Sequence, residues 1–437
     1  MLLMRIGTGM RRWVGRVAVI CGLAAAAAPC SASGATWSAQ TVPGLSGPPN
    51  AALTGVSCVS ATFCMALGAS DFGFDHLGIN LRGPIAASSD RWDGATWSLV
   101  PFTSAGPSPT LASLSCTSPT FCVAVGSTNT IGRQSLIGTI PGHSPKSRAV
   151  VQVWNGTTWK AQATPLTAVR GSALSGVSCV SSQFCIAVGS IGLENARVLR
   201  FNGHGWKLLT LPFVKWGPTL AAVSCLTTNF CTAVGSYDTK VTGVADLHPL
   251  AERWNGRHWS VAKPPAERDV FHGKPYLNFT WLTSVSCPSR TSCLATGLAM
   301  RTQNIYPQGG YAVRWDGHRW STATTGLSRT SPLNGVSCAA ANDCYAGGQF
   351  DPRTVTTPPH QAPLIMHWAS GRWARETLPA VATMTNLVWS ENNLLVPNLF
   401  GISCVLQIGC TAVGAQPQGT HSAPLALSDL PLTVPVG

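Results

Sequence analysis

A pair of cysteines with five residues between them recurs seven times along this chain, and no other feature constrains the fold as strongly. The first copy reads SCVSATFC from residue 57, and every later copy keeps the opening Ser-Cys and the closing Cys. Such a pair can hold a metal, carry out redox chemistry or form a disulfide, and each alternative implies a different kind of protein. The pairs are Cys58 with Cys64, Cys116 with Cys122, Cys179 with Cys185, Cys225 with Cys231, Cys287 with Cys293, Cys338 with Cys344 and Cys404 with Cys410.

The N-terminal residues have the pattern of a secretory signal peptide. A basic stretch ends at Arg16, an apolar run extends from Val17 to Ala28, and small residues follow. We therefore expect residues 1–35 to be a signal peptide and residues 36–437 to form the exported domain, outside the cell or in the cell envelope. The general secretory and twin-arginine export routes both stay open. No later segment is long and apolar enough to cross a membrane.

Export favours disulfides as the explanation of the cysteine pairs. An even number of paired cysteines outside the cell indicates a disulfide framework. Zinc ligands are usually two to four residues apart and converge in two sets, whereas here the spacing is five and no histidine recurs with it. Redox motifs have two intervening residues, and a single copy suffices for their chemistry. The sequence therefore predicts seven local disulfides and neither a metal nor a cofactor.

The cysteine pairs belong to a longer repeat that predicts four strands per unit. Successive first cysteines lie 46 to 66 residues apart, a period typical of propellers and solenoids. Each pair joins two short strands, as in GVSC followed by FCMALG. Between the pairs comes a second motif, RWDGATW in its first copy, in which Asp-Gly or Asn-Gly separates two aromatic-flanked strands. This dipeptide is a strong hairpin signal, because both residues tolerate the backbone of a tight turn.

The two ends of the chain predict a closed ring. Before the first cysteine unit stands only the second half of an aromatic hairpin, around Trp37, and after the seventh stands APLALSDL, the first half of one. A chain that starts with the outer strand of its last blade leaves no large open sheet edge. The sequence therefore predicts an all-β fold, a seven-bladed β-propeller of four-stranded antiparallel blades, closed by the N-terminal strand.

With these motifs, SCxSxxFCxAVG and WdGxxW, the chain resembles secreted bacterial β-propeller repeat proteins. It is also similar to kelch, WD40 and Asp-box propellers, the last of which include the sialidases. The stretch from Ser89 to Trp97 is close to an Asp-box, although Asp93 directly precedes Gly94. The resemblance implies the propeller fold, whereas function has to be argued from a site.

Strand order predicts where a ligand would bind. If the strands of a blade are A to D from axis to rim, the cysteine turn joins A to B and the Asp-Gly turn joins C to D, on one face. The longer and more variable B–C and D–A connections lie on the other face, where recognition is expected. Three tryptophans outside the repeat positions, Trp216, Trp281 and Trp389, fall in or beside D–A connections. We expect them either to contact a ligand or to cover the wall of the central funnel.

The densest polar cluster of these connections contains Glu267, Asp269, His272 and Tyr276. It is a second group of candidate ligand-binding residues, or else a solvated loop. A glycoside hydrolase needs two paired carboxylates, and the chain has only five glutamates. No nucleophile elbow, phosphate-binding loop or dinucleotide fingerprint is present, so no catalytic residue is assigned.

Charge adds one weaker candidate surface. The chain has a formal net charge of +13. Basic residues stand in or beside successive C–D turns, at Arg257, His258, His318, Arg319 and Arg372, where they are either solvated turn residues or a surface for an anionic envelope polymer. Aromatic and basic residues do not interleave as in nucleic-acid-binding proteins.

Three functional hypotheses remain. We favour a monomeric binding scaffold for a glycan, an envelope polymer or a protein, with no nucleic-acid partner. The alternatives are a sialidase-like or other glycoside hydrolase and a purely structural envelope protein.

Overall fold

The structure is a computed structural model that describes most of residues 36–431. Residues 1–35 lie outside this range, so the signal peptide and the domain boundary stay predictions. In β4, β5, β20, β21 and a few strand ends only the backbone is described. The gaps within the range are residues 44–50, 70–71, 76–77, 82–86, 103–108, 129–145, 193–194, 215–216, 239–246, 272–273, 278, 301–306, 328–330, 351–361, 382–397 and 419–420.

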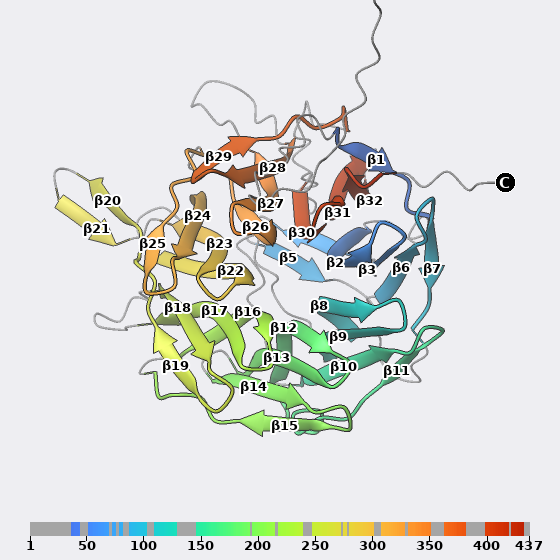
Figure 1. Cartoon of the computed structure of the whole chain (residues 1–437), viewed down its shortest axis with the longest axis horizontal. Helices are drawn as coiled ribbons and strands as arrows, with labels where there is room; N and C mark the ends of the chain where they lie inside the picture. The colour runs from blue at the N-terminus through green and yellow to red at the C-terminus, as the bar shows by residue number, and fades with distance from the viewer. Residues whose placement is uncertain are drawn as a thin grey trace, which may run out of the picture. The chain divides into compact units, whose positions relative to one another are not determined.

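The described residues form seven four-stranded antiparallel sheets arranged as the blades of a β-propeller (Figure 1). The predicted fold class and the A-to-D strand order are therefore confirmed. In A-to-D order the first four blades are β2 (Ala52–Ser60), β3 (Phe63–Ala69), β6 (Ala87–Trp92) and β7 (Trp97–Val100); β8 (Pro109–Ser118), β9 (Phe121–Thr128), β10 (Arg148–Trp154) and β11 (Trp159–Ala161); β12 (Ser172–Ser181), β13 (Phe184–Ile191), β14 (Ala196–Phe201) and β15 (Trp206–Leu209); and β16 (Thr219–Thr227), β17 (Phe230–Asp238), β18 (Leu247–Trp254) and β19 (Trp259–Ala262).

Blades 5 to 7 follow the same order, and the last of them takes its D strand from the N-terminal part of the chain. They are β22 (Phe279–Ser289), β23 (Ser292–Met300), β24 (Pro307–Trp315) and β25 (Trp320–Thr322); β26 (Leu333–Ala340), β27 (Asp343–Phe350), β28 (Ala362–Ala369) and β29 (Arg372–Arg375); and β30 (Asn398–Val405), β31 (Gly409–Gln418), β32 (His421–Ser428) and β1 (Ser38–Gln40). Ser38 pairs with Ser428 and Gln40 with Ala426. This pairing confirms that the N-terminal strand completes blade 7.

All seven predicted cysteine pairs form disulfides at the A–B turns, which confirms the predicted pairing. In blade 1, Cys58 and Cys64 stand directly opposite each other in the β2–β3 ladder, at the end of the hairpin. The other six bridges join Cys116 to Cys122, Cys179 to Cys185, Cys225 to Cys231, Cys287 to Cys293, Cys338 to Cys344 and Cys404 to Cys410.

The second cysteine of every pair is buried, so each bridge is anchored in the core of its blade. These residues are Cys64, Cys122, Cys185, Cys231, Cys293, Cys344 and Cys410. Each bridge closes a loop of about seven residues, which by the chain-entropy estimate stabilises the fold by about 2 kcal/mol. The repeated motif is therefore part of the scaffold.

The C–D turns have one backbone structure, which the Asp-Gly and Asn-Gly dipeptides explain. In the first turn, Asp93 Oδ1 accepts hydrogen bonds from the backbone N–H groups of Ala95 and Thr96, at 2.9 and 2.8 Å. Gly94 has a backbone φ of 104°, a value that residues other than glycine rarely adopt. In the sixth turn, where the dipeptide is missing, Ser370 and Gly371 take positive φ values of 51° and 80°.

The core lies between the blades, at interfaces that we call seams. At the seam of blades 3 and 4, Ile186 and Val198 from one blade pack with Leu220, Leu250 and Trp254 from the next. The repeat tryptophans are buried except Trp373, which is half-buried, and those that flank one turn contact each other, as Trp92 and Trp97 do at a centroid distance of 5.6 Å. The repeat tryptophans therefore pack the scaffold.

A belt of seven side-chain hydrogen bonds connects the A strands around the ring. The serine before the first cysteine of each blade accepts a hydrogen bond from the backbone N–H of the first cysteine in the next blade. Ser57 accepts from Cys116 at 2.9 Å, and Ser403 of blade 7 accepts from Cys58 of blade 1 at the same distance. The other acceptors are Ser115, Ser178, Ser224, Ser286 and Ser337. Each Ser-Cys dipeptide therefore bonds to both neighbouring blades: its serine accepts a hydrogen bond from the next blade, and its cysteine N–H donates one to the previous blade.

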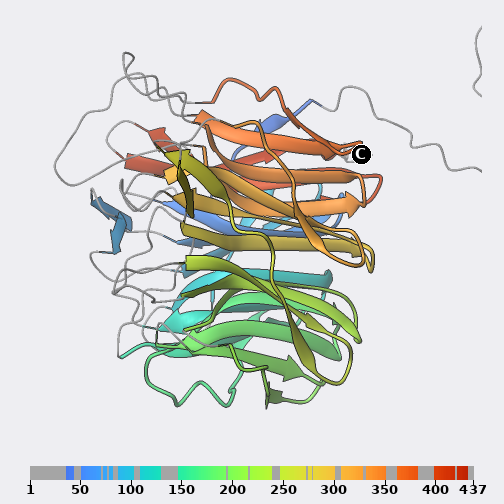
Figure 2. The same cartoon turned by 90° about the vertical axis from the view of Figure 1, so that its left-hand side faces the viewer.

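The connections define two faces, as predicted. The turn face has the A–B disulfide turns and the C–D turns, and the loop face has the B–C and D–A connections. Two additional hairpins belong to loop-face connections: β4 (Phe72–Asp75) with β5 (Gly78–Leu81), seen at the left in Figure 2, and β20 (Arg268–Phe271) with β21 (Lys274–Leu277). Within the described part of the chain, no helix has the length and apolar character needed to cross a membrane.

Candidate functional site

The structure places only one of the three off-pattern tryptophans. Trp281 lies on β22, is only 5% exposed and packs with Leu298 of the same blade and with Leu247 of blade 4. Its ring is therefore buried at the seam of blades 4 and 5 and does not offer an exposed stacking surface. Trp216 and Trp389 lie outside the described residues, so their roles stay predictions.

The predicted polar cluster follows the β20–β21 hairpin, at the left of Figure 1. Glu267, just before the hairpin, is exposed, and its backbone N–H donates to Thr280 Oγ1 at 3.4 Å. Asp269 and Tyr276 stand opposite each other in the hairpin backbone. Their side chains and the whole of His272 lie outside the described structure, so a joint site is neither shown nor contradicted.

A groove on the loop face, at the seam of blades 3 and 4, is the candidate ligand site. Its volume is about 740 Å³, within the range of about 300–1,000 Å³ that is typical of small-molecule sites. Most of its wall is the D–A connection after β15, in which Phe213 is 89% exposed. The start of β14 adds Arg197, and the end of β15 adds Leu208, which is 42% exposed.

Glu252 lines this groove from β18, on the other side of the seam. Glu252 is only 1% exposed, and neither of its carboxylate oxygens has a hydrogen-bond partner in the described structure. Burial raises the pKa of this carboxyl to about 7, because removal from water penalises the charged form. A buried polar group without a partner costs about 1–3 kcal/mol, and natural proteins keep few of them.

The repeat shows which residues the position of Glu252 accepts. Glu252 lies two residues before the aromatic residue that ends its C strand, on the side that faces blade 3. The equivalent positions of blades 1 and 2 hold buried polar residues, Asp90 and Gln152, whereas those of blades 3, 5 and 6 hold buried apolar residues, Leu199, Val313 and Met366. An apolar residue therefore fits this position, and packing alone does not require a carboxyl there.

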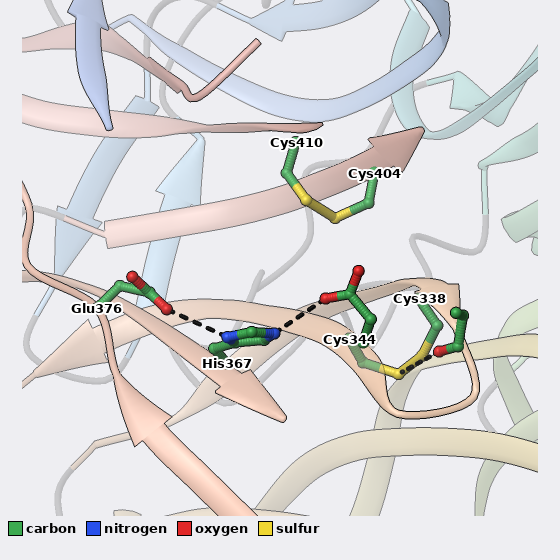
Figure 3. A network of polar contacts seen from close by, with 8 residues as sticks. Cys338, Cys344, His367, Glu376, Cys404 and Cys410 are labelled. Atoms are coloured by element: carbon green, nitrogen blue, oxygen red, sulfur yellow. Dashed lines mark hydrogen bonds and ion pairs between the residues drawn. A yellow bond between two sulfur atoms is a disulfide. The ribbon is translucent and has the colours of Figure 1, made fainter. Parts of the chain in front are cut away.

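A second cluster of ionisable groups lies at the seam of blades 6 and 7, toward the turn face. His367, on β28, makes contacts with two carboxylates: Nε2 is 2.9 Å from Asp343 Oδ1, and Nδ1 is 3.4 Å from Glu376 Oε1. Figure 3 shows the ring between them, near the disulfides of both blades. Tyr345 stacks on the imidazole at a centroid distance of 4.1 Å, and Trp37 contacts Tyr345 edge-on.

The carboxylates determine the charge of this histidine. Burial alone would lower the pKa of His367, but the hydrogen bonds to Asp343 and Glu376, and then their charges, raise it to about 9. The imidazole is therefore protonated at neutral pH. Asp429 lies near the same carboxylates and accepts a hydrogen bond from the backbone N–H of Cys410. Burial, together with the charges of Glu376 and Asp343, raises the pKa of Asp429.

This cluster has the residue types of a catalytic site but not the free groups that catalysis needs. Both imidazole nitrogens donate to carboxylates, so the ring has no lone pair with which to accept a proton. Asp343 and Glu376 are bridged by the histidine instead of facing an open space between them. The arrangement can hold a positive charge between two blades, and it is suited to stabilising the seam.

Sequence reasoning missed both ionisable groups, although the repeat contained a signal for each. His367 takes the position that arginine occupies in four of the other copies, as at Arg314, and Asp343 takes the position of the phenylalanine in SCVSATFC. Glu252 takes a position that is apolar in blades 3, 5 and 6 and polar in blades 1 and 2. An alignment of the seven copies position by position would have found these departures. Among the described residues, no three His, Cys, Asp or Glu side chains are arranged to hold a metal.

Comparison with known proteins supports the fold. A scan against protein families finds no match, and neither does a search of curated proteins. Similar solved structures include YCF48 bound to D1 peptide, which is 11% identical with a TM-score of 0.50 over 90% of this chain and 95% of that one. YCF48 from Cyanidioschyzon merolae is 11% identical, with a TM-score of 0.49 over 90% and 98% of the two chains.

A GH74 xyloglucanase from Xanthomonas campestris is 10% identical, with a TM-score of 0.47 over 89% of this chain and 55% of that one. At such low identity these likenesses concern the fold alone, because one propeller architecture serves many unrelated functions.

Proposed function

We propose that this protein is an exported or cell-envelope binding scaffold that holds a glycan or a protein on its loop face. One observation carries the proposal: the buried, unpartnered carboxyl of Glu252 lines the groove between blades 3 and 4. Because an apolar residue fits the equivalent position of other blades, the cost of the carboxyl is understandable if a ligand supplies its missing hydrogen bonds.

The surroundings of Glu252 suit ligand binding. Phe213 and Leu208 offer exposed apolar surface at the rim, while Asn195, Thr210 and Arg197 add polar groups. A mostly apolar groove with a few convergent polar groups is the common form of a ligand site. The seven disulfides and the predicted signal peptide support an extracellular location, and a rigid stapled ring is a suitable frame for such a surface.

Hydrolysis is a weaker proposal. A glycoside hydrolase needs two carboxylates about 5–10 Å apart across the substrate. Glu252 is the one carboxylate among the described residues that line the groove, and the pair around His367 is bridged. A purely structural role leaves the unpartnered carboxyl without an explanation.

The test is a binding screen of residues 36–437 against glycan and peptide arrays, followed by variants of the groove. E252L is expected to fold, to gain about 1–3 kcal/mol in free energy of unfolding and to lose binding, because leucine removes an unpaired buried carboxyl. L208A is expected to weaken binding by roughly threefold to tenfold, as expected for lost apolar contact.

Leu99 provides the matched control. It holds the same D-strand position in blade 1 as Leu208 in blade 3 and is also exposed, at 50%. L99A should leave binding unchanged. Binding that E252L and L208A retain in full, or no binder in either array, would contradict the proposal.

A further inference from the structure

Two arginines on the turn face, at the seam of blades 4 and 5, share one aromatic ring. The Cζ atom of Arg253 lies 5.2 Å from the ring centroid of Phe230, and that of Arg290 lies 5.4 Å from it. Arg253 also lies 4.2 Å from the Trp315 ring, and Arg290 donates to the side-chain oxygen of Asn229. Aromatic and amide contacts therefore fix both guanidinium groups in place.

No acid neutralises this pair within the described part of the chain. The ion pairs found there involve Asp316, Asp343 and Glu376, and none includes Arg253 or Arg290. The Nε of Arg253 is buried without a hydrogen-bond partner. Burial, followed by the charge of Arg290, lowers the pKa of Arg253. Two cations held near each other without a counter-charge create a local positive potential that favours an anion.

A small pocket extends this positive site toward blade 3. Its volume is about 290 Å³, and Asn229, the residue that binds Arg290, forms part of its wall. Arg200 lines the same pocket from blade 3, at the position equivalent to Arg253 in blade 4. Gln183, Asn202 and Thr228 complete the polar part of the wall. Arg200, Asn229, Arg290 and Arg253 therefore form a strip across two seams, which we call the arginine strip.

We propose that the arginine strip binds an acidic polysaccharide, with carboxylates of one polysaccharide chain near Arg200 and near the Arg253–Arg290 pair. This site lies on the face opposite the groove of Glu252 and shares no residue with it, so it goes beyond the proposed function. Guanidinium groups bind carboxylates with two parallel hydrogen bonds.

The groups between the arginines favour a sugar chain over other polyanions. Side-chain amides and a hydroxyl both donate and accept hydrogen bonds, as sugar hydroxyls do. The amide oxygens of Asn202 and Asn229 already accept hydrogen bonds within the protein, whereas Gln183 and Thr228 can also accept from a sugar hydroxyl. A polyphosphate chain offers acceptors alone and cannot donate to these two residues. The net charge of +13 attracts any polyanion at long range, so the short-range groups determine the choice.

The experiment measures binding of polygalacturonate to residues 36–437, with dextran and inorganic polyphosphate of matched length as comparisons. We expect polygalacturonate to bind more tightly than polyphosphate, dextran not to bind, and the affinity to fall as salt rises from 50 to 500 mM, about the concentrations that change screening strongly. R290Q removes an exposed guanidinium and should weaken binding roughly tenfold, as for loss of one charge-assisted contact.

R372Q is the comparison variant that separates the strip from the wider basic surface expected from the sequence, because Arg372 is also exposed on the turn face but lies on blade 6, outside the strip. It should change binding less than about twofold, as expected for a distant surface charge. R200Q tests the other end of the strip without touching the packed Arg253. Equal losses in R290Q and R372Q would show diffuse attraction and overturn the proposal, as would tighter binding of polyphosphate or no binding of polygalacturonate.

Discussion

The seam between blades 3 and 4 and the seam between blades 6 and 7 both contain ionisable side chains, but they treat them in different ways. At blades 6 and 7, His367 contacts a carboxylate on each side and stacks on Tyr345. At blades 3 and 4, Glu252 is deeper in the protein and has no partner in the described structure. The repeat sets the same backbone at both seams, so side-chain chemistry alone makes the difference.

The comparison separates stability from function. A polar network whose members satisfy one another strengthens the structure that contains it, whereas an unpartnered buried group weakens it. The cluster that resembles a catalytic site is thus the better candidate for a structural role. The solitary carboxyl, which resembles nothing catalytic, is the better candidate for contact with a ligand.

The largest effect is expected from reducing the disulfides, which are the same at both seams. Each bridge contributes about 2 kcal/mol by the chain-entropy estimate, so loss of all seven should lower the melting temperature by more than any single substitution does. Thermal unfolding with and without reductant measures this. An unchanged melting temperature would mean that packing and the serine belt hold both seams without the bridges.

The next effect distinguishes the seams. H367A should lower the free energy of unfolding by about 2 kcal/mol, since it leaves Asp343 and Glu376 without their charge-assisted contacts, reduced here by partial exposure. R314A, at the same position in blade 5, is exposed and should change it by less than about 0.5 kcal/mol. Denaturant unfolding compares the two. Equal changes would remove the distinction between the seams.

The smallest effect is in the dependence of stability on pH, in two windows that overlap only near pH 7. Burial raises the pKa of Glu252 from 4.5 to about 7, so between these values the folded state holds a proton that the unfolded state has lost. The raised pKa of His367 does the same between 6.5 and about 9. In both windows stability should fall as pH rises, by on the order of 1 kcal/mol each, and partial exposure reduces the contribution of His367.

Unfolding titrations from pH 4 to 9.5 measure the two windows. E252L should remove the fall in the acidic window alone, and H367A the fall in the basic window alone. If either variant changes both windows, the groups are coupled and the two seams are not independent.

Much of the fold was predictable because its signals are local. A disulfide between Cys58 and Cys64 and a turn at Asp93-Gly94 depend on residues within a few positions of one another, and the repeat multiplies each signal. The split hairpin at Trp37 then gave the number of blades. Long connections carry no such repeated signal, so the sequence left two alternatives for Trp281, ligand contact or cover of the funnel wall, and the structure shows only that its ring is buried.

The candidate sites were harder to predict because they arise between blades. Whether Glu252 meets a partner depends on what the neighbouring blade presents across the seam, tens of residues away in sequence. His367 and Glu376 are close in sequence, but Asp343 reaches the same ring only through the β27–β28 ladder. The serine of the Ser-Cys dipeptide is constant in all seven copies, yet its acceptor role appears only when the ring is assembled.

The pairing of β1 with β32 has a consequence for the order in which the ring can form. β1 precedes the other strands of the propeller in the sequence, but its partner spans His421–Ser428, in the last blade. Each disulfide joins cysteines only 6 positions apart, so it can form within its own hairpin before the other blades are in place. The local crosslinks can therefore form independently of one another, while the circle closes only when the first and the last blade strands meet.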